Sequence, residues 1–196
     1  SGGNIALAAG CEVLASASHV HIEPSTDIEM SLGVNTASTF SLTDTELDQI
    51  TTTGTLQFGV AKGATTIVNG VTRNVGTETE LRILTTGDLT FSTVASSFAS
   101  TTYMTSTHHI AFTESLTTSG GVLKIIADNN CNGAGSDDLL SIATTKAVTS
   151  TNQDISITAS DIELIGNLDA GSGVVSITAC SSNPIRLGGT DATSGA

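Results

Sequence analysis

The chain has 196 residues and a formal net charge of -13, and only six of its residues are lysine or arginine. Contact with nucleic acid phosphates needs a basic surface that this chain cannot assemble, so nucleic acid is disfavoured as a partner, and anionic membranes are disfavoured for the same reason. No apolar run approaches the ~20 residues of a membrane-spanning helix, so we expect no membrane insertion, and any targeting signal would lie outside this segment.

The composition predicts a folded chain with a thin core. Hydrophobic residues make up 38% of the sequence, too many for a disordered segment. Aromatic residues make up only 3%, and tryptophan is absent, so the bulky apolar mass of a round core is missing. We therefore expect a narrow interior of isoleucine, leucine and valine, with threonine and serine at outward positions.

Short runs in which apolar and polar residues alternate recur along the chain, as strands with one buried face require. They cover residues 5–7, 20–22, 28–32, 56–58, 89–91, 155–157, 162–164, 175–177 and 185–187. Clusters of Gly, Asn, Asp and Ser separate the runs, and these residues favour turns. Many short strands with turns between them fit either a β-sandwich or a solenoid of stacked parallel sheets.

One segment, residues 43–50, predicts a short helix. Thr43 followed by Glu46 three residues later forms a capping box, in which each side chain satisfies the other residue's backbone N–H. A helix of barely two turns is not stable alone, so we expect it to form a corner inserted between coils of the chain. Its inward side chains would be Leu42, Leu47 and Ile50, and its outward ones Asp44, Glu46 and Asp48.

An internal repeat favours the solenoid over the sandwich. Residues 20–33 match residues 175–188 at their apolar positions, including Val20 with Val175, at an offset of about 155 residues. The sequence therefore predicts one continuous domain, residues 1–196, of about one and a quarter tandem modules. Residues 1–41 would end one module and residues 42–196 would form the next. Coils of ~20 to 30 residues would stack inside each module.

Three stretches carry a resemblance to a known family: residues 40–59 (FSLTDTELDQITTTGTLQFG), residues 157–179 (ITASDIELIGNLDAGSGVVSITA) and residues 184–196 (PIRLGGTDATSGA). They resemble modules of the large filamentous-haemagglutinin-like proteins of microbial surfaces. The resemblance implies an all-β, right-handed parallel β-helix (a β-solenoid), secretion to the cell surface, and an elongated shape. It also implies a structural role, in which the chain self-associates or continues in tandem modules to form a filament, a surface appendage or an adhesin stalk.

Two alternatives to a structural role remain open. One is a recognition module that binds glycans or a host surface through an exposed flank. The other is a polysaccharide-active enzyme, which would need a strong base or a pair of acids at a cleft. The basic residues do not cluster in the sequence, so we expect no catalysis. They are Lys62, Arg73, Arg82, Lys124, Lys146 and Arg186.

The strongest chemical motif is DNNCNGAGSDD, residues 128–138. Oxygen-bearing side chains at alternate positions, followed by Gly133 at the sixth, reproduce the first half of a calcium loop. Position twelve is Leu139 rather than Glu, so a nearby aspartate would have to supply the missing carboxylate. The same residue types favour a plain polar turn, and both interpretations stay open. The candidate calcium ligands are Asp128, Asn130, Asn132, Asp137 and Asp138, and no other cofactor is expected.

The three cysteines, Cys11, Cys131 and Cys180, follow no metal-binding or CxxC spacing. Their odd number leaves three options open: one disulfide with a free thiol, a bridge to a neighbouring chain or module, or three buried thiols.

Two pairs of histidines are expected at the surface without a metal. On a strand, His19 and His21 would share one face about 7 Å apart, but a third ligand is missing. His108 and His109 would point to opposite faces if the chain is extended there.

Overall fold

The structure is a computed structural model that describes residues 13–24, 26–34, 40–59, 65–74, 77–131 and 138–180. Within these residues the chain forms 21 strands and one short helix. The chain is therefore nearly all β, as the alternating pattern predicts, and its strands lie in parallel sheets. No helix in these ranges is long and apolar enough to cross a membrane.

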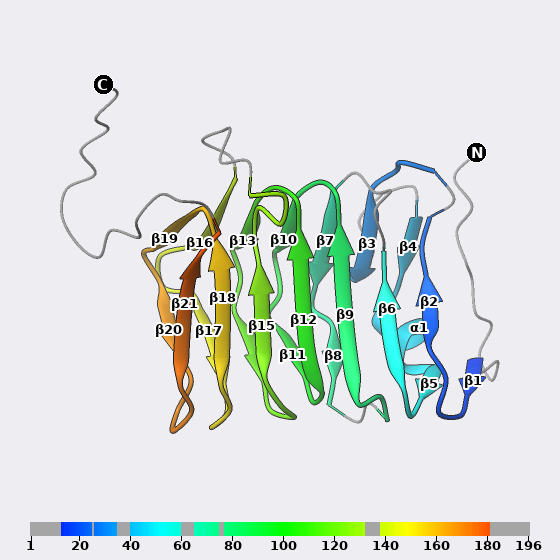
Figure 1. The fold of residues 1–196 in the computed structure, drawn as a ribbon. Coiled ribbons are helices and arrows are strands. Elements are labelled where there is room, and N and C mark those ends of the chain that lie inside the picture. The colour runs from blue at the N-terminus through cyan, green and yellow to red at the C-terminus, as the bar shows by residue number, and fades with distance from the viewer. Residues whose placement is uncertain are drawn as a thin grey trace.

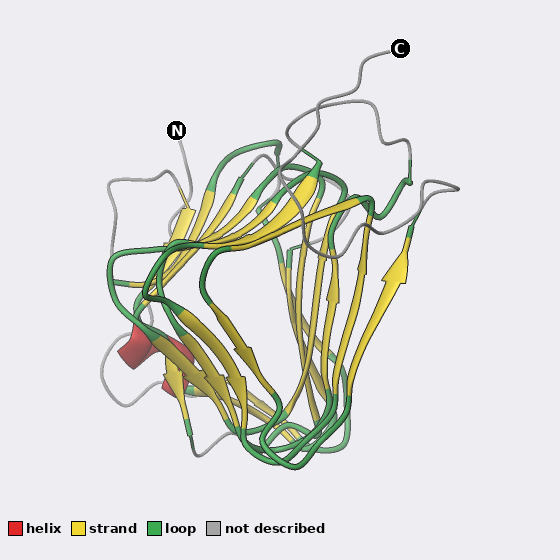
Figure 2. Ribbon diagram, turned by 90° about the vertical axis from the view of Figure 1, so that its left-hand side faces the viewer, coloured by secondary structure: helices red, strands yellow, loops and turns green. Residues whose placement is uncertain are grey.

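Three parallel sheets form the body of the described molecule and surround one interior (Figure 2). Sheet 1, which faces the viewer in Figure 1, has the spatial order β2 (Val20–Ile22), β6 (Thr55–Phe58), β9 (Glu80–Thr85), β12 (Thr101–Ser106), β15 (Leu123–Ile126), β18 (Ile155–Ala159), β21 (Val175–Ala179). Sheet 2 has the order β4 (Phe40–Leu42), β3 (Met30–Gly33), β7 (Thr66–Asn69), β10 (Leu89–Phe91), β13 (Ile110–Phe112), β16 (Leu139–Ile142), β19 (Asp161–Leu164). Sheet 3 has the order β8 (Thr72–Arg73), β11 (Ser96–Phe98), β14 (Leu116–Thr118), β17 (Ala147–Ser150), β20 (Asn167–Asp169). A separate pair is formed by β1 (Val13–Ala15) and β5 (Ile50–Thr52).

The chain visits the three sheets in turn. From β6 onward each strand pairs with the strand three places later, so that β6 pairs with β9, β7 with β10 and β8 with β11. Leu89 pairs with Ile110, and Ile110 with Leu140, at separations of 21 and 30 residues, which agree with the coil length expected from the sequence. The strand order establishes a parallel all-β stack, and the right-handed β-helix stays a prediction.

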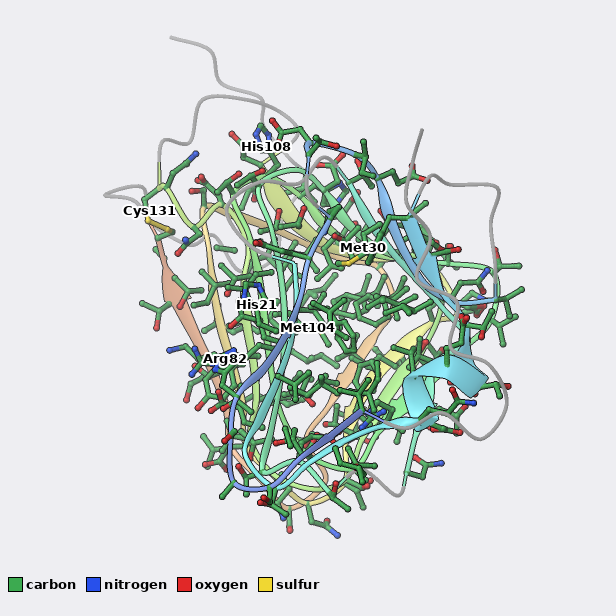
Figure 3. All side chains as sticks on the ribbon, turned by 90° about the vertical axis from the view of Figure 1, so that its right-hand side faces the viewer. His21, Met30, Arg82, Met104, His108 and Cys131 are labelled. Atoms are coloured by element: carbon green, nitrogen blue, oxygen red, sulfur yellow. A yellow bond between two sulfur atoms is a disulfide. The ribbon has the colours of Figure 1, made fainter. Side chains whose placement is uncertain are left out.

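Two rows of side chains run along the inner face of sheet 1 through directly paired positions. One row consists of Val20, Leu56, Leu81, Thr102, Leu123, Ile155 and Val175. The other consists of Ile22, Phe58, Ile83, Met104, Ile125, Ile157 and Ile177, and Figure 3 shows Met104 in the interior. The repeat partners Val20 and Val175 therefore stand at the two ends of one described row.

Three phenylalanine side chains pack against one another in this thin core. The rings of Phe91 and Phe112 lie on adjacent strands of sheet 2 and stack with their centroids 4.8 Å apart, and Phe98 meets Phe91 edge to face at 6.4 Å. A cavity of about 10 Å³ remains nearby, between Leu47 and Phe98 among other apolar side chains. That is about the least space in which one water fits, so the interior is packed here and holds no ligand pocket.

The expectation that threonine and serine stay outside is wrong at the ends of the strands. Thr102 and Ser106, near the two ends of β12, are fully buried. The Thr102 hydroxyl donates to the carbonyl oxygen of Ser100 (3.0 Å), and the Ser106 hydroxyl donates to that of Gly87 (2.6 Å). Because these hydroxyls satisfy carbonyl groups of the turns, small polar side chains can occupy the interior there.

Thr118 and Ser150 are paired neighbours on β14 and β17, both fully buried, and neither hydroxyl has a hydrogen-bond partner among the described residues. Thr118→Val keeps the shape and removes the orphaned hydroxyl, so we expect the free energy of unfolding to stay unchanged or rise by about 1 kcal/mol. Thr102→Val is the matched control: it removes a bonded hydroxyl and should lose about 1 kcal/mol. Equal losses in denaturant unfolding of the two variants would contradict this.

The predicted helix is present as α1 (Asp44–Asp48), which lies between β4 and β5 at one corner of the stack (Figure 2). Thr43 caps it, and both hydrogen bonds of the capping box form with Glu46. Leu42, Leu47 and Ile50 are buried, as predicted. The helix ends two residues earlier than expected, because Ile50 already begins β5 and pairs with β1.

Thr43→Ala removes the side-chain acceptor of this cap and is expected to lower the free energy of unfolding by about 1 kcal/mol. Thr45, exposed within the helix, offers the control, since Thr45→Ala keeps the cap and improves helix propensity. Urea unfolding of both variants measures the difference. A loss in Thr45→Ala that equals the loss in Thr43→Ala would show that the cap is not responsible.

Candidate functional site

The predicted calcium loop starts directly after β15, at a tight turn. Asp128 has a positive φ of 53°, and its backbone N–H donates to the carbonyl oxygen of His108 (3.0 Å). The N–H of Cys131 donates back to the carbonyl oxygen of Asp128 (2.9 Å), which closes a turn with Asn129 and Asn130 at its centre. Asp and Asn tolerate a positive φ and favour such turns, so the local structure agrees with the plain-turn interpretation of the motif.

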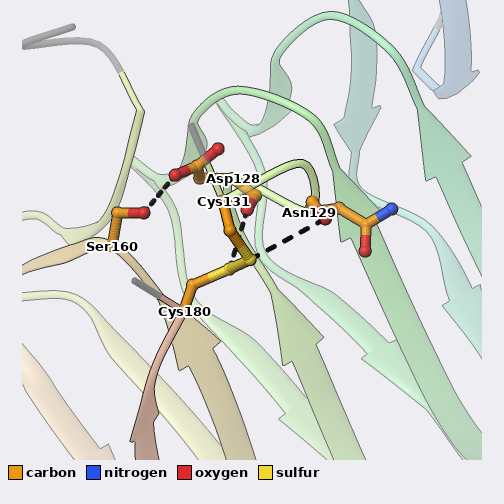
Figure 4. The surroundings of a disulfide bond; sticks show 5 residues. All are labelled: Asp128, Asn129, Cys131, Ser160 and Cys180. Carbon is orange, nitrogen blue, oxygen red and sulfur yellow. Dashed lines mark hydrogen bonds between the residues drawn. A yellow bond between two sulfur atoms is a disulfide. The ribbon is translucent and has the colours of Figure 1, made fainter. Parts of the chain in front are cut away.

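The two described carboxylates of the predicted calcium site have different partners. Asp128 is fully buried, and its Oδ2 accepts a hydrogen bond from the hydroxyl of Ser160 (Figure 4). Asp138 is also buried, and its Oδ1 lies 3.3 Å from Nδ1 of His108. The other candidates, Asn132 and Asp137, lie outside the described residues.

Within the described ranges, no three His, Cys, Asp or Glu side chains are grouped so that they could hold a metal ion. Calcium binding therefore stays a prediction. Thermal unfolding with calcium and with a chelator tests it, because an ion that binds only the folded state raises the melting temperature. A plain turn leaves the melting temperature unchanged.

Cys131 and Cys180 form a disulfide with their Cα atoms 5.2 Å apart (Figure 4). Cys131 follows β15 and Cys180 follows β21, and β18 lies between these strands in sheet 1. The bridge therefore passes over the end of β18, near Ser160. Sγ of Cys180 lies 3.1 Å from the carbonyl oxygen of Asp128. The third cysteine, Cys11, lies outside the described residues.

Each histidine has a partner among the described residues. The rings of His19 and His21 lie edge to face with centroids 6.0 Å apart, close to the expected spacing. Nε2 of His21 lies 3.6 Å from Oε2 of Glu23. His108 faces Asp138, whereas Nε2 of His109 lies 2.7 Å from the hydroxyl oxygen of Ser141.

A histidine in contact with a serine hydroxyl, as His109 is with Ser141, also occurs in hydrolytic sites. Such a site also needs a group that orients the histidine and donors that stabilise an oxyanion, arranged around a cleft. Ser141 alternates with the buried Leu140 and Ile142, so it lies on the outer face of sheet 2. The expectation that the chain is not an enzyme stays a prediction.

Arg73 and Glu78 form a buried ion pair that sequence reasoning did not find. The side chains are 3% and 0% exposed, and two hydrogen bonds of 3.0 and 2.8 Å join the guanidinium to the carboxylate. Nη1 of Arg73 also donates to the carbonyl oxygen of Leu47 (2.5 Å), and Nη2 donates to that of Ile50 (3.1 Å). Since β8 and β5 belong to different sheets, this side chain connects two strands that no ladder joins in the described residues.

Two further cations lie together on the outer face of sheet 1. Arg82 and Lys124 are the register partners of Tyr103 on either side, and their charged ends lie 5.4 and 6.0 Å from the centroid of its ring. Figure 3 shows Arg82 on the outer face of sheet 1, whereas Met104 lies on the inner face. We call the outward line to which they belong the Tyr103 row. Its described members are His21, Gln57, Arg82, Tyr103, Lys124, Ser156 and Ser176.

The sequence carried a signal for this cluster. Arg82, Tyr103 and Lys124 follow one another at intervals of 21 residues, which is the length of a short coil. The remaining described cation, Lys146, forms an ion pair with Glu114 through Oε2 at 2.8 Å and through Oε1. Lys62 and Arg186 lie outside the described residues.

The comparisons with known proteins identify no relative. No protein-family model matches the chain, and neither a curated protein nor a solved structure matches it. Its function must therefore be argued from its own residues.

Proposed function

We propose that the chain is a right-handed parallel β-helix that serves as a stiff segment of an elongated extracellular filament, surface appendage or adhesin stalk. The observation that carries this proposal is the in-register row from Val20 to Val175, in which one interior position repeats across seven parallel strands. Stacked repeats of this kind contact only their neighbours, so the same interior can continue over many modules. A mechanical role needs no further chemistry.

Large apolar side chains are exposed at both ends of the stack, and this supports continuation by a further coil or subunit. At the N-terminal side, β4 is buried at all three of its positions, but Val13 (38% exposed) and Leu14 (70%) of β1 are not covered. At the other side, β19, β20 and β21 are the outermost described strands, and their region exposes large apolar side chains. These are Leu164 (43% exposed), Ile165 (59%), Val174 (61%) and Val175 (40%). A following coil or a second subunit would cover them and would pair the strand edges, which natural sheets rarely leave open.

Electron microscopy of the purified chain tests the proposal. A structural segment should assemble end to end into ordered polymers with a fixed axial repeat. A recognition module should stay discrete and be retained on a carbohydrate array, and an enzyme should degrade a pectin-like polysaccharide. Discrete particles without axial order at high protein concentration would contradict the structural role. The parent sequence offers an independent check, since tandem modules should recur at about 155 residues.

A further inference from the structure

The Tyr103 row stands apart from the rest of this acidic chain. Arg82 and Lys124 are half-exposed cations on either side of one aromatic ring, within a chain of net charge -13. Glu80 accepts a hydrogen bond from Nε of Arg82, and the Nη groups of the guanidinium could donate to another anion. The Lys124 ammonium has no carboxylate partner among the described residues.

The geometry of the row fits an extended ligand. Adjacent strands in a sheet are ~4.8 Å apart, so Arg82 and Lys124 are rooted on backbones about 9.6 Å apart with Tyr103 between them. Ser156 and Ser176 continue the row on the Lys124 side, whereas Gln57 on the other side is buried and donates from Nε2 to the carbonyl oxygen of Gly59. A polymer that crosses the strands from β9 toward β21 would meet the row's side chains on five successive strands: Arg82, Tyr103, Lys124, Ser156 and Ser176. Oxyanions on such a polymer could accept hydrogen bonds from Arg82 and from Lys124, on either side of the Tyr103 ring.

We propose that the Tyr103 row binds an acidic polysaccharide, whose carboxylate or sulfate groups are held between Arg82 and Lys124. A protein partner fits this surface less well, because the aromatic anchors of protein interfaces are inserted into pockets of the partner, whereas the Tyr103 ring already lies against Arg82 and Lys124. The proposal goes beyond the structural role and does not depend on it, since a discrete chain and a filament would present the same row.

The chain supplies its own probe of this site. Tyr103 is the one tyrosine of the sequence and tryptophan is absent, so intrinsic tyrosine fluorescence reports on the centre of the row. The titrations use polygalacturonate for carboxylates, dextran sulfate for sulfates, and neutral dextran as the uncharged polymer. They are run at about 0.15 M salt, where the field of distant carboxylates is screened within roughly 8 Å. Affinity electrophoresis through gels containing each polymer gives a second readout.

Saturable binding to polygalacturonate or to dextran sulfate, without binding to neutral dextran, supports the proposal, and the better polymer identifies the anion. Lys124→Gln and Arg82→Gln should each weaken binding about threefold to tenfold. Lys146→Gln is the matched control, because it removes a cation that is paired with Glu114 and lies outside the row. Circular dichroism confirms that each variant folds.

Four results would contradict the proposed site. The first two are no binding to either acidic polymer in both measurements, and binding to neutral dextran as strong as to the acidic polymers. The other two are a loss of affinity in Lys146→Gln equal to that in Lys124→Gln, and unchanged affinity in both Lys124→Gln and Arg82→Gln. A fluorescence change that depends on protein concentration without any polymer would assign the row to contacts between copies of the chain instead. Sedimentation of the polymer-free protein measures that case directly.

Discussion

Removal of the Cys131–Cys180 disulfide is expected to lower the free energy of unfolding by about 4 kcal/mol. The bridge joins residues 49 positions apart, and the loss of loop-closure entropy that it imposes on the unfolded chain gives this magnitude. For a chain of this length the melting temperature should fall by on the order of 10 °C. Reduction of the wild type and the double variant Cys131→Ser/Cys180→Ser should give the same result.

Without the disulfide, the end of sheet 1 at β21 should open before the whole stack unfolds. Strand β21 is the outermost described strand of sheet 1, and it pairs with β18 on one side only. The bridge holds the end of β21 against the turn at Asp128, two strands away. Without it, the amides of Val175–Ala179 should exchange with solvent well before those of Leu123–Ile126, which lie inside the sheet.

Hydrogen exchange with and without reductant measures which of the two strands exchanges first. Denaturant unfolding measures the total change in the free energy of unfolding. The double variant is also the control, because reductant should not change its stability further. A change on reduction of the double variant would point to Cys11. Uniform acceleration over both strands would mean that the bridge stabilises the whole stack rather than its end.

The interior of the molecule was largely predictable from the sequence, because the signals for it are local. Period-2 runs such as residues 155–157 and 175–177 became paired strands, β18 and β21. The capping box at Thr43 and Glu46 fixed the start of α1, since both of its hydrogen bonds lie within four residues. The apolar repeat placed Val20 and Val175 at equivalent positions of one row.

Several of the strands that the sequence did not reveal have polar side chains inside. In β12, TTYMTS, the inward residues are Thr102, Met104 and Ser106, and two of these three are hydroxyl residues. An apolar alternation cannot detect such a strand, because turns that supply bonding partners for buried hydroxyls are only known once the coils are stacked. The burial of Arg73 could not be predicted for the same reason, because its hydrogen-bond partners at Leu47 and Ile50 are known only once α1 and β5 are placed beside it.

Loss of the Arg73 side chain is expected to destabilise the protein more than loss of any exposed cation. Arg73→Met leaves the carboxylate of Glu78 buried without its partner, and a broken buried pair typically costs 3–5 kcal/mol, so we expect a loss of about 4 kcal/mol. The carbonyl groups of Leu47 and Ile50 lose their donors at the same time. The corner formed by α1 and β5 should therefore open first.

Three further variants separate these contributions in urea unfolding. Lys146→Met breaks an ion pair whose side chains are 30% and 15% exposed, and it should cost about 1 kcal/mol, less than loss of the fully buried pair. Arg73→Lys keeps the charge but loses the planar fork, so its loss should lie between those of the two methionine variants. Arg73→Met/Glu78→Met removes both charges and should recover part of the loss, because a buried pair replaced by apolar side chains is often neutral.

The double variant should regain only part of the lost free energy of unfolding, because Arg73 also bonds to the corner formed by α1 and β5. If Arg73 bonded only to Glu78, the double variant would have the same free energy of unfolding as the wild type. Here the two orphaned carbonyl groups remain, and each buried unsatisfied group costs about 1–3 kcal/mol. Full recovery would therefore refute the role of Arg73 as the connection between β8 and β5, and so would a loss below about 1 kcal/mol in Arg73→Met.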